Sequence, residues 1–298
     1  MEPWFDGFES QTHEIDGIRL HLRVGGRHDG QPLVLLHGFP QTHVMWHRVA
    51  QALAPHYRLV LPDLRGYGDS DKPPGTPDHA NYSKRTMAAD IAALMSSFGH
   101  ERFLACGHDR GGRVAHRLAL DHPHRVEKLA LIDIAPTLDM YERTDMAFAR
   151  AYYHWFHLIQ PAPLPERMIA GDAVFYLRWK LGGWGSAGLQ YIEARALAEY
   201  ERCFCRAEAI HAACEDYRAA AGIDLEHDRA ARAAGQKIAC PTLVLWGDRG
   251  VVHRLFDPPA LWQAQCAAAV TAQAMQAGHY IPEELPGETA VLLRTFFG

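Results

Sequence analysis

The sequence lacks the features that mark membrane, secreted or nucleic-acid-binding proteins. It has no continuous apolar run of about 18 residues, so we expect no membrane-spanning helix. Its first twelve residues include Glu2, Asp6 and Glu9 and no apolar core, which is not typical of a signal peptide. The formal net charge is -5 at pH 7, and this excludes a strongly basic surface for nucleic acid or an anionic membrane.

Cysteine and histidine patterns give no sign of a disulfide framework or a metal site. The six cysteines form no C-x-x-C pair, so we expect reduced thiols in a cytoplasmic protein. Nineteen histidines are present, but none belongs to an H-E-x-x-H pattern or a comparable ligand cluster. We therefore expect an enzyme or binding protein without a metal or other cofactor.

Alternating strand and helix patterns predict an α/β fold. Short apolar runs recur as buried parallel strands and alternate with helical spacing, which predicts a mostly parallel, doubly wound sheet. A hairpin over 14–24, with Asp16-Gly17 at its turn, precedes this sheet. The predicted strands are 33–36, 59–61, 103–106, 129–132, 242–246 and 270–275, and the predicted core helices are 49–53, 86–98 and 113–120.

The alternation stops after residue 132 and returns at 242. Between these points the segments 141–159, 189–206 and 207–221 have helical patterns, and no convincing strand is present. This predicts a helical cap, residues 136–236, inserted between two core segments, 1–135 and 237–298. The cap is expected over the carboxyl edge of the sheet, where open α/β folds bind ligands.

The sharpest motif is G-H-D-R-G-G at 107–112, directly between a predicted strand and a helix. Such a turn presents its central side chain at the sheet edge as a nucleophile elbow, and here that residue is Asp109. A carboxylate is ionised at neutral pH and can displace a leaving group from saturated carbon, forming an ester. An Asp at this place is also a common helix N-cap, so the motif alone leaves both interpretations open.

Three further loops follow predicted strands. In H-G-F-P at 37–40, the Phe39 N–H is expected to join the Arg110 N–H in an oxyanion hole. A turn at 63–70, D-L-R-G-Y-G-D-S, is expected to be structural. In A-G-H-Y at 277–280, His279 can reach the elbow as a general base.

Together these motifs resemble the α/β-hydrolases with a helical cap, and within them the fluoroacetate (haloacetate) dehalogenases. The resemblance covers about residues 7–297. The elbow, H-G-F-P and the late G-H are shared with epoxide hydrolases and haloalkane dehalogenases. The more specific motifs are D-R-G-G-R at 109–113, Y-H-W at 153–155, Q-P-A-P-L-P-E-R at 160–167 and C-E-D-Y-R at 214–218.

The resemblance implies that Arg110 and Arg113 hold a substrate carboxylate. They stand three residues apart on one helix, so their side chains share a face and repel each other unless an anion lies between them. A bidentate clamp on a small carboxylate is one use for that pair. A solvated basic face, or pairing with acids of the cap, is the alternative.

The resemblance also implies a halide site made by His154, Trp155 and Tyr217. Each side chain offers a hydrogen-bond donor to a departing, strongly hydrated fluoride. Aromatic residues at helical spacing are equally typical of core packing. Trp184, in the glycine-rich segment of the cap, is expected to line the entrance or to pack.

Two aspartates compete as the partner of His279. Asp133 follows the strand at 129–132, where the dehalogenase pattern has its acid, and Asp248 follows the next strand, where many other α/β-hydrolases have theirs. The resemblance favours Asp133.

The implied activity is hydrolytic dehalogenation of fluoroacetate or a close 2-haloacid by a cytoplasmic homodimer. An epoxide hydrolase with the same Asp109 and His279 is the main alternative, with Tyr217 and either Tyr153 or Tyr191 as its acids. A haloalkane dehalogenase is disfavoured because Arg110 stands where those enzymes usually have Trp. A ligand-binding protein without catalysis is a third possibility.

Overall fold

The computed structural model describes residues 4–186 and 188–298. Within that part of the chain, one sheet has the order β1-β2-β4-β3-β5-β6-β7-β8. β1 and β2 pair antiparallel, β2 and β4 pair antiparallel, and all other neighbours are parallel. The fold is therefore the mostly parallel α/β-hydrolase sheet that the sequence predicts. Its strands are β1 (Glu9–Ile15), β2 (Ile18–Gly26), β3 (Gln31–Leu36), β4 (Tyr57–Pro62), β5 (Phe103–His108), β6 (Val126–Ile132), β7 (Thr242–Gly247) and β8 (Val270–Met275).

The predicted hairpin is formed by β1 and β2. Its turn has positive φ at both central positions, 48° at Asp16 and 79° at Gly17, as a tight two-residue hairpin turn requires. Ile15 pairs with Ile18 at the end of the ladder. The hairpin adds an antiparallel edge to the sheet.

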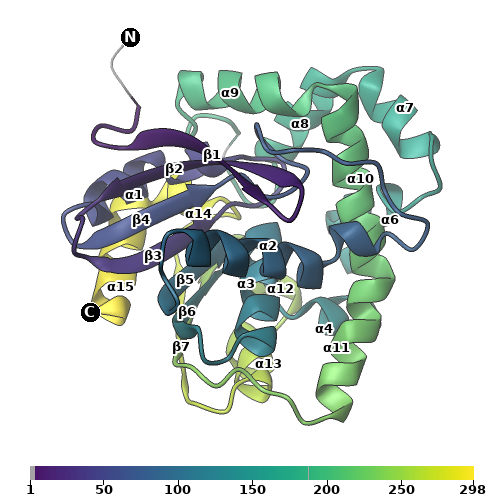
Figure 1. Ribbon diagram of the computed structural model, residues 1–298. Coiled ribbons are helices and arrows are strands. Elements are labelled where there is room, and N and C mark those ends of the chain that lie inside the picture. Colours follow the sequence, from purple (N-terminus) through teal and green to yellow (C-terminus); the bar gives the residue numbers. More distant parts are fainter. Residues whose placement is uncertain (1–3, 187) are drawn as a thin grey trace.

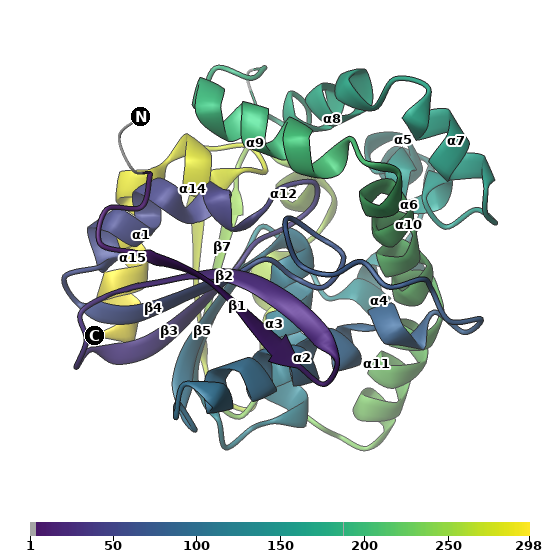
Figure 2. The same ribbon diagram turned by 45° about the horizontal axis from the view of Figure 1, so that its top comes forward.

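Helices cover both faces of the sheet, which explains why the central strands are continuous apolar runs (Figure 2). α1 (His47–Leu53) packs against α15 (Pro286–Phe297) on one face, next to the short α14 (Ile281–Glu284). α2 (Lys84–Ser97), α3 (Asp109–Asp121) and α13 (Pro258–Gln265) cover the other face, where Trp262 packs on His116. α12 (Val251–Leu255) follows β7.

Helices α4 to α11 lie between β6 and β7 in the chain and cover one side of the core (Figure 1). Their bounds are α4 (Thr137–Glu142), α5 (Met146–Ala151), α6 (Tyr153–His157), α7 (Leu164–Ala170), α8 (Ala173–Leu181), α9 (Ala194–Phe204), α10 (Ala207–Ala221) and α11 (Ile223–Ala233). The domain limits at 135/136 and 236/237 stay a prediction. In the described part of the chain, no helix has the length and apolarity needed to cross a bilayer.

One predicted cap helix is wrong. The segment 141–159 is interrupted twice instead of forming a continuous helix. Asp145 is extended and its side chain caps α5 by accepting from Phe148 N–H at 2.8 Å, and Tyr152 leaves helical geometry before α6. These breaks turn α6 toward the core, with His154 and Trp155 buried.

Candidate active site

The predicted elbow lies where β5 ends and α3 begins. Asp109 has φ = 45°, a left-handed conformation that is strained for a residue other than glycine. Small neighbours make this turn sterically possible, because a Cβ on Gly111 would lie 2.5 Å from the Leu36 carbonyl oxygen. A Cβ on Gly38 would lie 2.6 Å from Cβ of Asp109. The glycines therefore let the H-G-F-P loop and α3 approach the buried Asp109 side chain.

One of the two expected oxyanion donors contacts the nucleophile. The Phe39 N–H donates to Asp109 Oδ2 at 3.0 Å. Within the described residues, the Arg110 N–H makes no hydrogen bond to that carboxylate, and Oδ1 accepts none. The carboxylate thus has one oxygen fixed by the backbone and one available for chemistry.

Charged neighbours keep the Asp109 carboxylate ionised. Burial by itself would raise the pKa of Asp109, but His279 first, and then Arg113 and Arg110, hold that pKa below its ordinary value. An ionised carboxylate next to cations is a ready nucleophile at neutral pH.

The structure pairs His279 with Asp133. His279 Nδ1 lies 2.5 Å from Asp133 Oδ2, and the Gly247 N–H donates to Asp133 Oδ1 at 3.0 Å. Burial lowers the pKa of His279, but the hydrogen bond and charge of Asp133 and the charge of Asp109 raise it above its ordinary value overall. His108 Nε2 contacts the His279 carbonyl oxygen at 2.8 Å, and this fixes the loop that carries the imidazole.

The competing acid, Asp248, is placed elsewhere. Its backbone N–H donates to the Met275 carbonyl oxygen, and within the described part of the chain its side chain makes no hydrogen bond to His279. Of the two aspartates left open by the sequence, the geometry therefore favours Asp133.

Arg110 requires a correction to the expected clamp. Its guanidinium forms a bidentate ion pair with Asp216 of α10, with Nε–Oδ2 and Nη2–Oδ1 distances of 2.9 and 2.7 Å. The side chain is completely buried, with its guanidinium carbon 4.3 Å from the centroid of the Tyr217 ring. Only Nη1 lacks a partner among the described residues, so Arg110 can offer a substrate one nitrogen and not a bidentate face. Arg110 therefore pairs with an acid of the cap, which is the alternative to the clamp that the sequence left open.

Arg113 is a buried cation held by neutral groups. Nη1 donates to the Ala135 carbonyl oxygen at 3.1 Å and to Thr137 Oγ1 at 2.8 Å, and the guanidinium lies over the Trp155 ring. In the described part of the chain it has no carboxylate within ion-pair distance, and its Nε has no partner. Burial first, and the charge of Arg110 second, lower its pKa. An anion bound near Asp109 would compensate for the lost hydration of the Arg113 guanidinium and for its repulsion by Arg110.

The three predicted halide residues lie together in the structure. The His154 and Tyr217 rings have centroids 5.5 Å apart, the Trp155 and Tyr217 rings 6.4 Å, and the Phe39 ring packs on both His154 and Tyr217. The Tyr217 hydroxyl and His154 Nδ1 are buried without partners among the described residues. Burial lowers the pKa of His154 and raises that of Tyr217, so both are neutral donors at pH 7.

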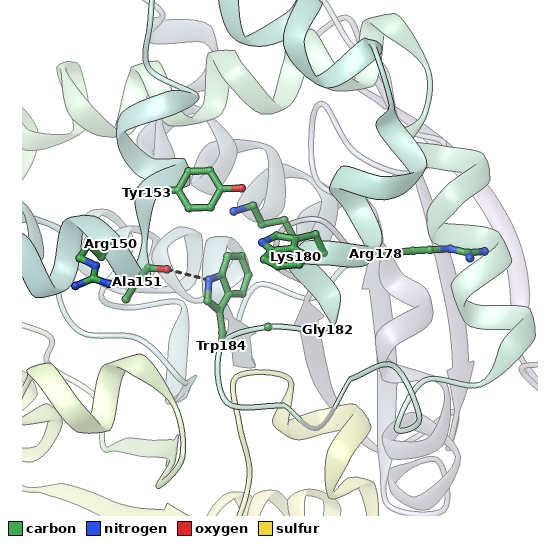
Figure 3. Close-up of a pocket in the computed structure, with 9 residues that line it drawn as sticks. Arg150, Ala151, Tyr153, Arg178, Lys180, Gly182 and Trp184 are labelled. Carbon is green, nitrogen blue, oxygen red and sulfur yellow. Dashed lines mark hydrogen bonds between the residues drawn. The ribbon is translucent and has the colours of Figure 1, made fainter.

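Trp184 forms part of the wall above this cluster. Its ring centroid lies 4.6 Å from that of His154 and 5.2 Å from that of His279. The indole N–H donates to the Ala151 carbonyl oxygen at 3.3 Å, which keeps the ring in place (Figure 3).

Two residues of the site surroundings were missed from the sequence. Asp216 stands in the C-E-D-Y-R motif but its pairing with Arg110 spans 106 positions, so no local pattern signals it. Lys180 is 2% exposed and lies against Tyr153 and Trp184. Lysine is rare in this chain, with five residues in all, but Lys180 belongs to no sequence motif that would predict a role for it.

Among residues 4–186 and 188–298, side chains that could ligate a metal gather at two places, both away from Asp109. His21, His43 and Asp63 form one group, but His43 Nδ1 and N–H both contact Asp63 Oδ1 at 2.8 Å, so His43 and Asp63 already satisfy each other. The second group is Asp69, Glu199 and Cys203, in which Asp69 and Glu199 both pair with an arginine. Neither group adjoins the elbow.

Comparison with known proteins agrees with the geometry. A family profile described as the alpha/beta hydrolase fold matches residues 31–284. A fluoroacetate dehalogenase from Burkholderia sp is 45% identical over 98% of this chain and 94% of its own length. A soluble epoxide hydrolase from Corynebacterium sp. (strain C12) is 33% identical over 91% of each chain. Among solved structures, a Nostoc sp PCC 7120 protein assigned to the alpha/beta hydrolases superposes with a TM-score of 0.95 and 52% identity, over 98% of this chain and 99% of that one.

These matches cover nearly the whole chain, and they include both the sheet and the cap. The profile match and the identity to relatives confirm the family resemblance that the motifs indicated. The chain belongs to the α/β-hydrolase fold family and is a hydrolase of the group that includes fluoroacetate dehalogenases.

Proposed function

We propose that the protein hydrolyses fluoroacetate or a close 2-haloacid to the 2-hydroxy acid and halide, without a cofactor. The observation that carries this proposal is the set of buried donors without partners around Asp109. Arg110 Nη1, Arg113 Nε, His154 Nδ1 and the Tyr217 hydroxyl are such groups among the described residues. Buried donors of this kind are costly unless an acceptor satisfies them, and a small anion that carries a halogen would do so.

In the first step, Asp109 Oδ1 attacks the α-carbon of the haloacid. The carbon–halogen bond breaks and its electron pair leaves with the halide, which the His154, Trp155 and Tyr217 donors solvate. Arg113 and the remaining nitrogen of Arg110 hold the carboxylate. The product of this step is an ester on Asp109.

In the second step, His279 removes a proton from water, and the water oxygen attacks Cγ of Asp109. Negative charge develops on Oδ2, which the Phe39 N–H already contacts at 3.0 Å. Collapse of this intermediate breaks the ester bond, and His279 returns its proton to the departing hydroxy acid. Asp133 stabilises the imidazolium between these transfers.

The test is halide release from fluoro-, chloro- and bromoacetate, measured by fluoride electrode and ion chromatography. Asp109→Asn should release none. His279→Asn should release one equivalent of halide and retain the ester as added mass on Asp109. Multiple turnover by His279→Asn, with no adduct on Asp109, would contradict the scheme.

Epoxide hydrolysis is the second candidate, because a soluble epoxide hydrolase is among the relatives. Epoxide hydrolysis requires acidic side chains that protonate the epoxide oxygen as the ring opens. The Tyr191 hydroxyl donates to the Leu181 carbonyl oxygen at 2.6 Å, and Tyr153 is 41% exposed, so neither joins Tyr217 in this arrangement. Diol formation from styrene oxide without halide release from haloacetates would favour the epoxide reaction. Tight binding of haloacids without turnover of either substrate would favour a binding protein.

We also propose a cytoplasmic homodimer. All six cysteines are unpaired in the structure, and reduced thiols are typical of the cytoplasm.

A further inference from the structure

A cavity of about 550 Å³ opens on the cap next to the candidate site, and we name it the vestibule. Tyr153, Lys180 and Trp184 are among the residues that line it (Figure 3). Trp184 is shared with the site, because its ring also packs on the rings of His154 and His279. The Trp184 side chain therefore contacts both a small solute in the vestibule and the site residues His154 and His279.

Lys180 is a buried cation at this cavity. Its Nζ lies 3.5 Å from the centroid of the Tyr153 ring, 5.3 Å from that of Tyr176 and 5.4 Å from that of Trp184. Within the described part of the chain, Nζ has no carboxylate at ion-pair distance, and burial is the only influence on its pKa. The ring faces compensate only part of the lost hydration of an ammonium group.

Among the described residues, the other charged and titratable groups near Lys180 supply no counter-charge. Arg178, on the same helix, is neutralised by Glu201 at 2.6 Å, and Arg150 of α5 is an exposed cation of the lining. On α6, the pKa values of His154 and His157 are lowered, first by burial and then by the charge of Lys180, so both imidazoles are neutral. The vestibule thus presents net positive charge.

We propose that Lys180 makes the vestibule a binding site for a small monovalent anion. This inference rests on the proposed function for its two sources of anion, which are the carboxylate of the incoming haloacid and the departing halide. The rings of Tyr153, Tyr176 and Trp184 lie around the ammonium group, and Lys180 also lines the vestibule, where an anion would supply the missing counter-charge. An anion held there is concentrated beside Trp184 and close to the catalytic groups.

The pH dependence follows from the burial of Lys180. Burial lowers the pKa of Lys180 to about 7, so its charge is present below that pH and lost above it. Anion binding in the vestibule should therefore weaken as pH rises through about 7.

A direct test uses NMR of lysine ε-carbons in the full-length protein, with the Lys180 signal assigned from its loss in Lys180→Met. The pKa of Lys180 is titrated with no added anion, with acetate and with bromide. A bound anion stabilises the ammonium form and should raise this pKa by about half a unit or more. A shift with acetate alone indicates a carboxylate entry site, and a shift with bromide alone indicates a halide site. An unchanged pKa with both anions overturns the proposal, whatever the outcome of the halide-release assay.

Kinetics provide the second test. Lys180→Met should lower kcat/KM for fluoroacetate about tenfold with little change in kcat, because it removes the charge that attracts substrate. Lys180→Arg keeps a charge at every accessible pH, so it should retain kcat/KM and lose its decrease above about pH 7. Lys237→Met, an equal change of charge on an exposed lysine outside the vestibule, is the control. Equal kcat/KM in Lys180→Met and Lys237→Met would refute a role for Lys180 in substrate capture.

Discussion

Substitution of Asp216 by Asn removes one buried charge and changes little in side-chain volume. Asp216 is 0% exposed and accepts from Arg110 at 2.7 and 2.9 Å and from the Tyr67 hydroxyl at 2.6 Å, and it also pairs with Lys84. In Asp216→Asn, two buried cations lose their shared counter-ion. Lys84 keeps Asp224 at 3.5 Å, but Arg110 has no other carboxylate within ion-pair distance in the described chain.

The expected loss of stability follows from the burial of the Arg110–Asp216 ion pair. Two unit charges at about 3 Å attract by about 5 kcal/mol at an effective dielectric constant near 20. Removal of one partner from a buried pair typically costs about 3–5 kcal/mol, because the other charge stays desolvated. We expect Asp216→Asn to lower the free energy of unfolding by that amount, which is a large part of the roughly 5–15 kcal/mol typical of folded proteins. Urea unfolding monitored by circular dichroism measures it.

The loss of stability in Asp216→Asn should also depend on pH. Burial would raise the pKa of Asp216, but Arg110 and Lys84 hold it well below its ordinary value, about 3.9 in unfolded chains. The stabilisation is therefore complete above about pH 4 and is lost as pH falls toward the folded-state pKa. The difference in stability between wild type and Asp216→Asn should stay constant near neutral pH and shrink below about pH 4.

Arg27 and Asp29 provide a matched control. They form the same bidentate Arg–Asp pair, at 2.7 and 2.9 Å, but on the surface. Solvent screens this pair, so Asp29→Asn should change the unfolding free energy little. Burial is not the cause of the loss if Asp216→Asn unfolds at the same urea concentration as Asp29→Asn, or if the stability deficit of Asp216→Asn is unchanged at acidic pH.

Three further predictions concern the base, the elbow and the assembly. The pKa of His279 is raised above its ordinary value of about 6.5, so kcat should increase with pH through a midpoint above that value, and a flat kcat profile would contradict its role as base. Gly38→Ala places a Cβ 2.6 Å from Cβ of Asp109, so kcat should fall about 100-fold, and wild-type turnover in a variant that unfolds at the wild-type temperature would exclude this steric effect. The Phe175 and Trp179 ring centroids lie 5.8 Å apart and both side chains are more than half exposed, so replacing both by Glu should convert the expected homodimer to a monomer in sedimentation velocity. A monomeric wild type would refute the dimer.

The core could be predicted from sequence because its signals are local. Buried parallel strands are short continuous apolar runs, and the predicted runs coincide with β3 to β7 to within a few residues at their ends. The edge strand β8 is largely exposed, and it lies at the predicted residues 270–275. The elbow was found for the same reason, since its strand, its small residues and its helix are contiguous. The identity of the acid near His279 was open in the sequence, because it depends on which loop reaches the imidazole.

The cap was predicted less well because two of its helices, α7 and α8, lack a clear helical signal in the sequence. α8 buries Leu177 and Leu181 but leaves Phe175 and Trp179 exposed, so its apolar residues do not follow one helical stripe. α7 follows Pro161 and Pro163 and has Pro165 in its first turn, and closely spaced prolines are typical of breaks between helices. Both helices were therefore missed, although together they carry much of the exposed apolar surface of the cap.

Long-range ion pairs explain why the site itself could be predicted only in part. Arg110 and Arg117 of α3 pair with Asp216 and Asp228, which belong to the cap helices α10 and α11. Apolar contacts tolerate small shifts between packed helices, whereas a bidentate buried pair fixes distance and direction. Because Tyr217 directly follows Asp216, the pair that neutralises Arg110 also places the Tyr217 hydroxyl near Asp109. The geometry of the anion site therefore depends on charges more than 100 residues apart. The motifs identify the residues of this site, but they do not specify which Arg110 N–H groups bind the cap and which are left for a substrate.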